Sequence, residues 1–197
     1  SLLLSDEEDL EKALRICKRR VALHSEDEQR LRLRFSNINK KKGVNQHEVW
    51  RDKESAILST KRILKYAKKY NTKAHILHVS TKDEILLLKN TKKNITCEVT
   101  PQHLTLYSPD CYNKLGSKAQ MNPPIRNKKH LDGLWKGIKD EIVNVIGSDH
   151  APHTIKEKKL NWPNSPSGLP GVQTTLPLML NHINEKKIKI EKVIELL

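Results

Sequence analysis

A short apolar strand predicted over residues 142–146 is followed at once by a carboxylate and two imidazoles. These side chains belong to Asp149, His150 and His153. Carboxylates and imidazoles at the carboxyl end of a strand are suited to metal binding and to proton transfer. The alternative interpretation is a polar strand end that leads into a surface loop.

Two other histidines occupy comparable places. His24 ends the strand predicted over residues 20–24, and His78 lies near the end of the strand predicted over residues 74–80. Together with Asp149 they are residue types that bind zinc. They are far apart in the sequence, so the hypothesis of a shared site depends on the strand ends meeting in space. Taken singly, each histidine favours a packed or capping role, and His75 is assigned no function.

The elements that must position these residues alternate along the chain. Besides the strands above, a strand is predicted over 95–100; helices are predicted over 5–19, 26–35, 53–70, 83–88, 130–140, 172–183 and 190–197, and polar loops over 37–46, 105–126 and 154–170. Ser5 is expected as the N-cap of the first helix, in a capping box with Glu8. Strands separated by helices predict right-handed crossovers and a parallel sheet.

Four strands that end in polar residues are typical of a (β/α) barrel, which carries its chemistry at the carboxyl ends of its strands. A complete barrel has eight strands and about 250 residues. The chain has 197 residues and four predicted strands. We therefore predict an α/β fold consisting of a partial barrel, roughly the second half, in one incomplete domain over residues 1–197.

The composition restricts the classes of function. The formal net charge is +14, but the lysines are spread along the chain with few aromatic residues between them, which favours solvated surfaces over nucleic-acid binding. There are three cysteines and no C-x-x-C pair, which fits a reducing cytoplasm. No apolar run is long enough to cross a bilayer.

Six segments together resemble one known family. They are His24-Ser-Glu-Asp, His78-Val-Ser-Thr, Glu98-Val-Thr-Pro-Gln-His-Leu, Asn122-Pro-Pro-Ile-Arg, Gly147-Ser-Asp-His-Ala-Pro-His and Gly168-Leu-Pro-Gly-Val-Gln-Thr. In this order the series resembles the C-terminal half of a dihydroorotase of the cyclic amidohydrolase kind, within the zinc amidohydrolase superfamily. The resemblance runs from about residue 1 to residue 197.

This resemblance implies a cytoplasmic enzyme of pyrimidine biosynthesis that reversibly closes N-carbamoyl-aspartate to dihydroorotate. It implies that His24 and His78 hold the second zinc of a binuclear site. Asp149 matches the aspartate that ligates the first zinc and acts as general base and then as acid.

The resemblance also implies contacts with a dihydroorotate-like small molecule. Asn122 and His153 match residues that contact the substrate, His153 at its carboxylate. The backbone around Pro170 and Gly171 matches the segment that closes over the substrate ring. Arg126, in the same motif as Asn122, could also bind an anionic or amide substrate, and the alternative is a solvated loop residue.

Parts of the family's site have no counterpart in this sequence. No H-x-H pair occurs, and neither the bridging group nor the arginine that accompanies the H-x-H pair is present. Unpaired strand edges also predict self-association or a complementing N-terminal half. A non-catalytic remnant or scaffold remains an alternative, as does a hydantoinase or allantoinase, although Asn122–Arg126 and Ala151–His153 favour a dihydroorotase.

Overall fold

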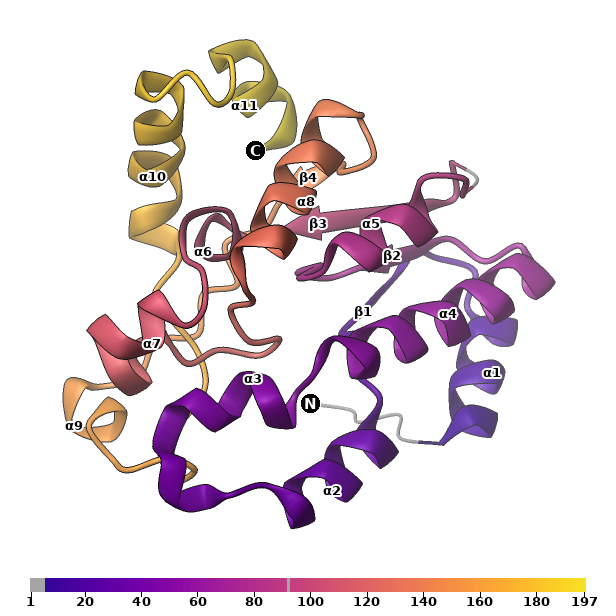
Figure 1. The fold of residues 1–197 in the computed structure, drawn as a ribbon. Helices are drawn as coiled ribbons and strands as arrows, with labels where there is room; N and C mark the ends of the chain where they lie inside the picture. Colours follow the sequence, from indigo (N-terminus) through magenta and orange to yellow (C-terminus); the bar gives the residue numbers. More distant parts are fainter. Residues whose placement is uncertain (1–5, 92) are drawn as a thin grey trace.

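The computed structural model describes residues 6–91 and 93–197 of the chain (Figure 1). Four short strands form a parallel sheet in the order β1-β2-β3-β4, which follows the order of the sequence. They are β1 (Val21–Leu23), β2 (Ala74–Ile76), β3 (Ile95–Val99) and β4 (Val145–Ile146). The predicted parallel α/β architecture is therefore confirmed.

Helices separate the strands and extend beyond their ends. They are α1 (Glu7–Ile16), α2 (Glu28–Asn37), the 3-10 helix η1 (Lys40–Gln46), α3 (His47–Trp50), α4 (Lys53–Tyr70), α5 (Lys82–Leu88), α6 (Pro101–Thr105), α7 (Asp110–Leu115), the 3-10 helix η2 (Gly116–Ala119), α8 (Lys128–Lys139), α9 (Ile155–Lys158), α10 (Val172–Asn184) and α11 (Ile190–Leu196). The prediction of plain loops over 37–46, 105–126 and 154–170 was wrong, because each of these segments contains a helix. Ser5, the expected N-cap of the first helix, lies outside the described residues.

Two of the strands are shorter than predicted for reasons visible in the structure. β2 ends at Ile76, because His78 has a positive φ of 35° that an extended strand cannot contain. Asn144 precedes β4, and its side-chain Oδ1 accepts a hydrogen bond from the amide of Cys97 at 2.9 Å. A side chain thus takes the place of a strand carbonyl at that position.

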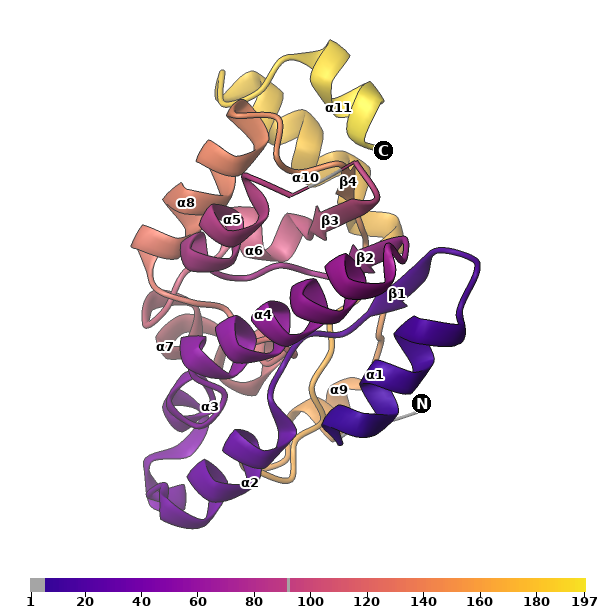
Figure 2. The same ribbon diagram turned by 90° about the vertical axis from the view of Figure 1, so that its right-hand side faces the viewer.

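One layer of helices packs beside the sheet. α1 contacts α4, α4 contacts α5 and α5 contacts α8 (Figure 2). The Asp52 side chain caps α4 by accepting from the amide of Ser55. At Gly133 of α8, an added Cβ would lie 2.2 Å from the Cβ of Lys82, so α5 and α8 approach too closely for a side chain there.

The core lies between this helical layer and the sheet. It contains aliphatic side chains from every strand, from α1, α4, α5 and α8, and from α10 and α11 near the end of the chain. Ile76 and Val99 on neighbouring strands are completely buried. Of the three cysteines, Cys97 and Cys111 are buried and Cys17, just after α1, is exposed. No helix in the described part of the chain is both long and apolar enough to span a membrane.

The excursions of the chain begin at the carboxyl ends of the strands. The segment 24–52 follows β1, the segment 100–127 follows β3 and the segment 147–171 follows β4. Within the described residues, β1 and β4 are each paired on one side only, so both edges of the sheet are open. The carboxyl ends of the strands therefore meet beneath three long loops.

Candidate metal centre

The two histidines at the ends of β1 and β2 face each other. His24 Nδ1 lies 3.0 Å from His78 Nε2, although 54 residues separate them. The rings meet edge to face, with their centroids 4.7 Å apart. β1 and β2 are neighbouring parallel strands, with Leu23 opposite Ile76, so the residues that follow them are brought to the same edge of the sheet.

His78 and Asp149 both have left-handed backbone conformations. Their φ values are 35° and 43°. Such a conformation is uncommon for residues other than glycine. It is often found at functional sites, where the backbone has to hold a side chain in one direction. In both cases the positive φ falls just after a strand, where it turns the chain out of the sheet.

His78 is buried and lacks a partner for one ring nitrogen. Its side chain is almost fully enclosed, and Nδ1 has no hydrogen-bond partner among the described residues. Burial, reinforced by the neighbouring His24 and His103, lowers the pKa of His78 to about 3. The ring is therefore neutral at physiological pH, which is the form that binds a metal.

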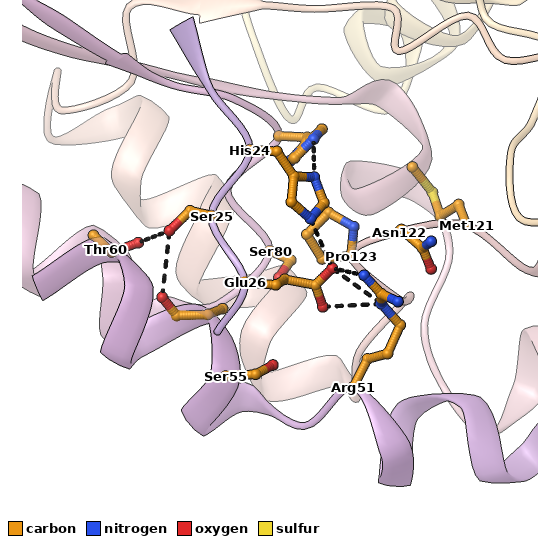
Figure 3. Close-up of polar contacts among 12 residues, drawn as sticks. His24, Ser25, Glu26, Arg51, Ser55, Thr60, Ser80, Met121, Asn122 and Pro123 are labelled. Carbon is orange, nitrogen blue, oxygen red and sulfur yellow. Dashed lines mark hydrogen bonds and ion pairs between the residues drawn. The ribbon is translucent and has the colours of Figure 1, made fainter. Parts of the chain in front are cut away.

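Glu26, which contacts His24, forms an ion pair with Arg51. The carboxylate of Glu26 accepts from His24 Nε2 at 3.0 Å and from Arg51 Nη2 at 2.5 Å. Arg51 Nε lies 3.0 Å from the same oxygen. Burial alone would raise the pKa of Glu26, but Arg51 and His24 outweigh it and hold this pKa well below its ordinary value. Glu26 is thus an ionised group that accepts hydrogen bonds from both His24 and Arg51, as Figure 3 shows for the contacts.

Asp149 is half buried beside a second carboxylate. Burial raises the pKa of Asp149, the charge of Glu98 raises it further, and His24 opposes both. Glu98 Oε2 lies 3.1 Å from His75 Nε2, and Glu98 Oε1 accepts weakly from the amide of His78 at 3.3 Å. Gly147 makes room for Glu98, because an added Cβ would lie 2.6 Å from its carboxylate.

The two histidines fit a zinc ion as a pair. Nitrogens that both lie 2.0–2.1 Å from a tetrahedral zinc are about 3.3 Å apart, close to the 3.0 Å between His24 Nδ1 and His78 Nε2. Asp149 is near enough for His24 to influence its pKa. However, across residues 6–91 and 93–197 no three His, Cys, Asp or Glu side chains converge on one point as a metal site requires. The described residues therefore provide two histidine ligands of a zinc site, and the site needs further ligands to be complete.

Asn122 is held by a histidine that no sequence motif indicated. The buried His47 Nε2 lies 2.9 Å from the carbonyl oxygen of Met121 and 3.1 Å from Asn122 Oδ1. Trp162 Nε1 donates to His47 Nδ1 at 3.3 Å, which leaves Nε2 as the protonated nitrogen. With its oxygen engaged in this way, Asn122 has its amide nitrogen free as a donor. No local spacing pattern links these residues.

The loop after β4 encloses one side of the site, and it carries His153, Pro170 and Gly171. His153 is exposed, and its Nε2 lies 3.1 Å from the carbonyl oxygen of Ser167. Gly171 is buried against Ser148, and an added Cβ there would lie 2.0 Å from the Ser148 carbonyl oxygen. Pro170 lines a cavity of about 590 Å³ between this segment, α6 and α10. Gly171 therefore has to be a glycine for the loop to reach this position.

Arg126 is a buried clamp, so its interpretation as a solvated loop residue was wrong. It is 4% exposed. Its guanidinium donates to the carbonyl oxygen of Arg51 at 2.6 Å and to Ser80 Oγ at 3.2 Å. The loop that carries Asn122 is thereby fastened to the residue that holds Glu26. These partners are 46 and 75 residues away, which the sequence pattern could not reveal.

Comparisons with known proteins identify relatives of the chain by sequence. No family model matches the chain. It is 34% identical over 203 residues to a dihydroorotase from Methanosarcina mazei, covering 96% of this chain and 44% of that protein. It is 32% identical over 186 residues to a dihydroorotase from Methanosphaera stadtmanae, covering 89% of this chain and 42% of the relative. The chain thus spans rather less than half the length of the curated relatives it matches.

A solved structure shows the same fold. The L-hydantoinase (dihydropyrimidinase) from Arthrobacter aurescens superposes on 96% of this chain with a TM-score of 0.89, at 23% sequence identity, and the match covers 45% of that protein. Together with the four parallel strands, this match confirms the predicted partial (β/α) barrel.

Proposed function

Because this chain belongs to the dihydroorotase family and spans less than half the length of its matched relatives, we propose that it forms one part of a zinc-dependent cyclic amide hydrolase. The substrate pair proposed is dihydroorotate and N-carbamoyl-aspartate, in pyrimidine biosynthesis. The observation that carries the proposal is the approach of His24 Nδ1 to His78 Nε2 at the carboxyl ends of neighbouring strands.

His24 and His78 would hold one zinc ion through these two nitrogens. When bound, zinc polarises an amide carbonyl and makes water a stronger acid. The chain's own proton carrier is Asp149, which takes a proton from the attacking water and returns it to the leaving ring nitrogen. Its raised pKa suits this role, because a more basic carboxylate accepts a proton more readily.

The remaining candidate residues would bind and orient the substrate. The amide nitrogen of Asn122, left free by the His47 contact, would donate to a substrate oxygen. His153 would contact the carboxylate, a group that its imidazole can recognise by donation or by charge. The backbone at Pro170 and Gly171, next to the cavity of about 590 Å³, would close over the ring.

The site needs further ligands from beyond the described residues. A catalytic zinc in proteins is held by three protein ligands, and the described residues bring together a pair. The open edges of β1 and β4 could pair with the strands that complete the barrel. We therefore propose that a complementing polypeptide, or a longer form of this chain, supplies the missing half, and that the chain alone self-associates.

Zinc content and turnover measured on the same sample test this function. We expect substoichiometric zinc and no dihydroorotate hydrolysis for residues 1–197 alone, and both zinc binding and turnover after co-expression with the remaining barrel segment of a relative. His78→Ala should then lower the zinc content, by loss of the ion that His24 and His78 would hold. His182→Gln is the matched control, because His182 contacts Thr105 and Glu185 away from the strand ends.

Two outcomes would contradict the proposal. A complemented barrel that binds zinc but does not hydrolyse dihydroorotate would indicate a non-catalytic remnant or a different cyclic amide substrate. A complemented barrel whose zinc content is unchanged by His78→Ala would place the metal elsewhere.

A further inference from the structure

His24 is the less constrained of the two paired histidines. Its side chain is 41% exposed, whereas His78 is buried. It also follows β1, which is an edge strand of the described sheet. Packing therefore does not fix the orientation of the His24 ring, and its polar contacts have to do so.

Those contacts select one tautomer. Arg51 donates to Glu26 through both Nε and Nη2, and a carboxylate paired in this way acts as an acceptor, so the 3.0 Å contact requires the hydrogen of a neutral His24 ring to lie on Nε2. The lone pair is then on Nδ1, the nitrogen that faces His78 Nε2 at 3.0 Å. The opposite tautomer would set two lone pairs against each other at the Glu26 contact.

Glu26 is itself held from several directions. Its side chain is 1% exposed, and Arg51 grips it through both Nε and Nη2. The carbonyl oxygen of Arg51 accepts from Arg126, which also donates to Ser80 after β2. The carboxylate is thus fixed relative to the segments that carry both histidines.

We propose that Glu26, held by Arg51, is a positioning residue that fixes the ring and tautomer of His24 so that Nδ1 is presented for ligation beside His78 Nε2. This deepens the proposed function and rests on it only for the identity of the ligand. A carboxylate behind a ligating histidine typically changes metal affinity by about 10- to 100-fold.

The test combines a measurement that needs no metal with one that does. In metal-free protein, long-range 1H–15N correlation spectra distinguish protonated from unprotonated ring nitrogens, and His24 is assigned by its loss in His24→Gln. We expect His24 protonated on Nε2, and a mixture of tautomers in Glu26→Gln. In the zinc-binding assembly, Glu26→Gln should weaken zinc binding by about 10- to 100-fold.

Glu28→Gln is the matched control, because this substitution removes the same charge. Glu28 is close in sequence to Glu26 but pairs with the exposed Arg32. Glu26→Gln leaves the Arg51 charge buried, so Glu26→Gln combined with Arg51→Met serves if the single variant does not fold. An unchanged tautomer in either variant would overturn the positioning role. A tautomer shift in Glu26→Gln, together with a complemented assembly that binds no zinc, would support the positioning role and overturn the proposed metal function.

Discussion

In the complemented enzyme, Asp149→Asn is expected to lower kcat for dihydroorotate hydrolysis by about 10²- to 10⁴-fold. An amide cannot take up the proton of the attacking water, and it cannot return one to the leaving nitrogen. The environment of Asp149, raised in pKa by burial and by Glu98, is what makes the carboxylate suited to this role. Steady-state kinetics with dihydroorotate, together with zinc analysis of the same sample, measure the effect.

Asp132→Asn controls for the charge change. Asp132 is exposed on α8, outside the loop after β4 that carries Asp149. We expect its kcat to remain within a factor of two of the unsubstituted protein. Full turnover of Asp149→Asn would show that Asp149 does not transfer the proton and that the loop after β4 has only a structural role.

Acidification from pH 7 to pH 4.5 is expected to reduce the free energy of unfolding by several kcal/mol. Burial lowers the pKa values of His47, His103 and His130 to about 4. In the unfolded chain these histidines titrate near 6.5. Below that pH these histidines are protonated in the unfolded state but not in the folded state. The free energy of unfolding therefore falls as the pH drops from about 6.5 to about 4.

Each of these histidines contributes up to about 3 kcal/mol by this linkage, and the contributions need not add. Glu84 acts in the opposite direction, because burial raises its pKa and acid neutralises it in place. Urea unfolding at pH 7 and pH 4.5, followed by tryptophan fluorescence, measures the net change.

His47→Gln assigns part of the acid effect. Its amide nitrogen can still donate to the Met121 carbonyl oxygen, but it does not titrate. We expect this variant to lose less stability on acidification than the unsubstituted chain. Equal urea midpoints at the two pH values for the unsubstituted chain would show that these histidines are not held neutral in the fold.

The sequence predicted the parts of the fold that depend on local pattern. The 18-residue helix α4 has an Asp cap and a regular apolar face, and its predicted bounds match the observed ones. The convergence of His24 and His78 followed from one geometric rule, that the carboxyl ends of neighbouring parallel strands lie at one edge. That rule needs only the order of the strands, which the alternation of elements indicated.

Long-range contacts were beyond the reach of the sequence. His47 and Arg51 lie in a polar stretch without periodicity, and they acquire their places from residues 25 or more positions away. Arg126 looks like a loop arginine because its partners come from two other segments. The helices inside the predicted loops are short, so tertiary contacts determine them more than propensity does.

The distribution of cysteines gives the protein one exposed thiol that can be labelled. Burial raises the pKa of the Cys97 and Cys111 thiols to about 12, while Cys17 stands exposed after α1. A maleimide dye should therefore label one position of the unmodified chain. Energy transfer from that dye to a second dye on a complementing segment would follow the joining of two barrel halves in real time, without any cysteine being introduced or removed in this chain.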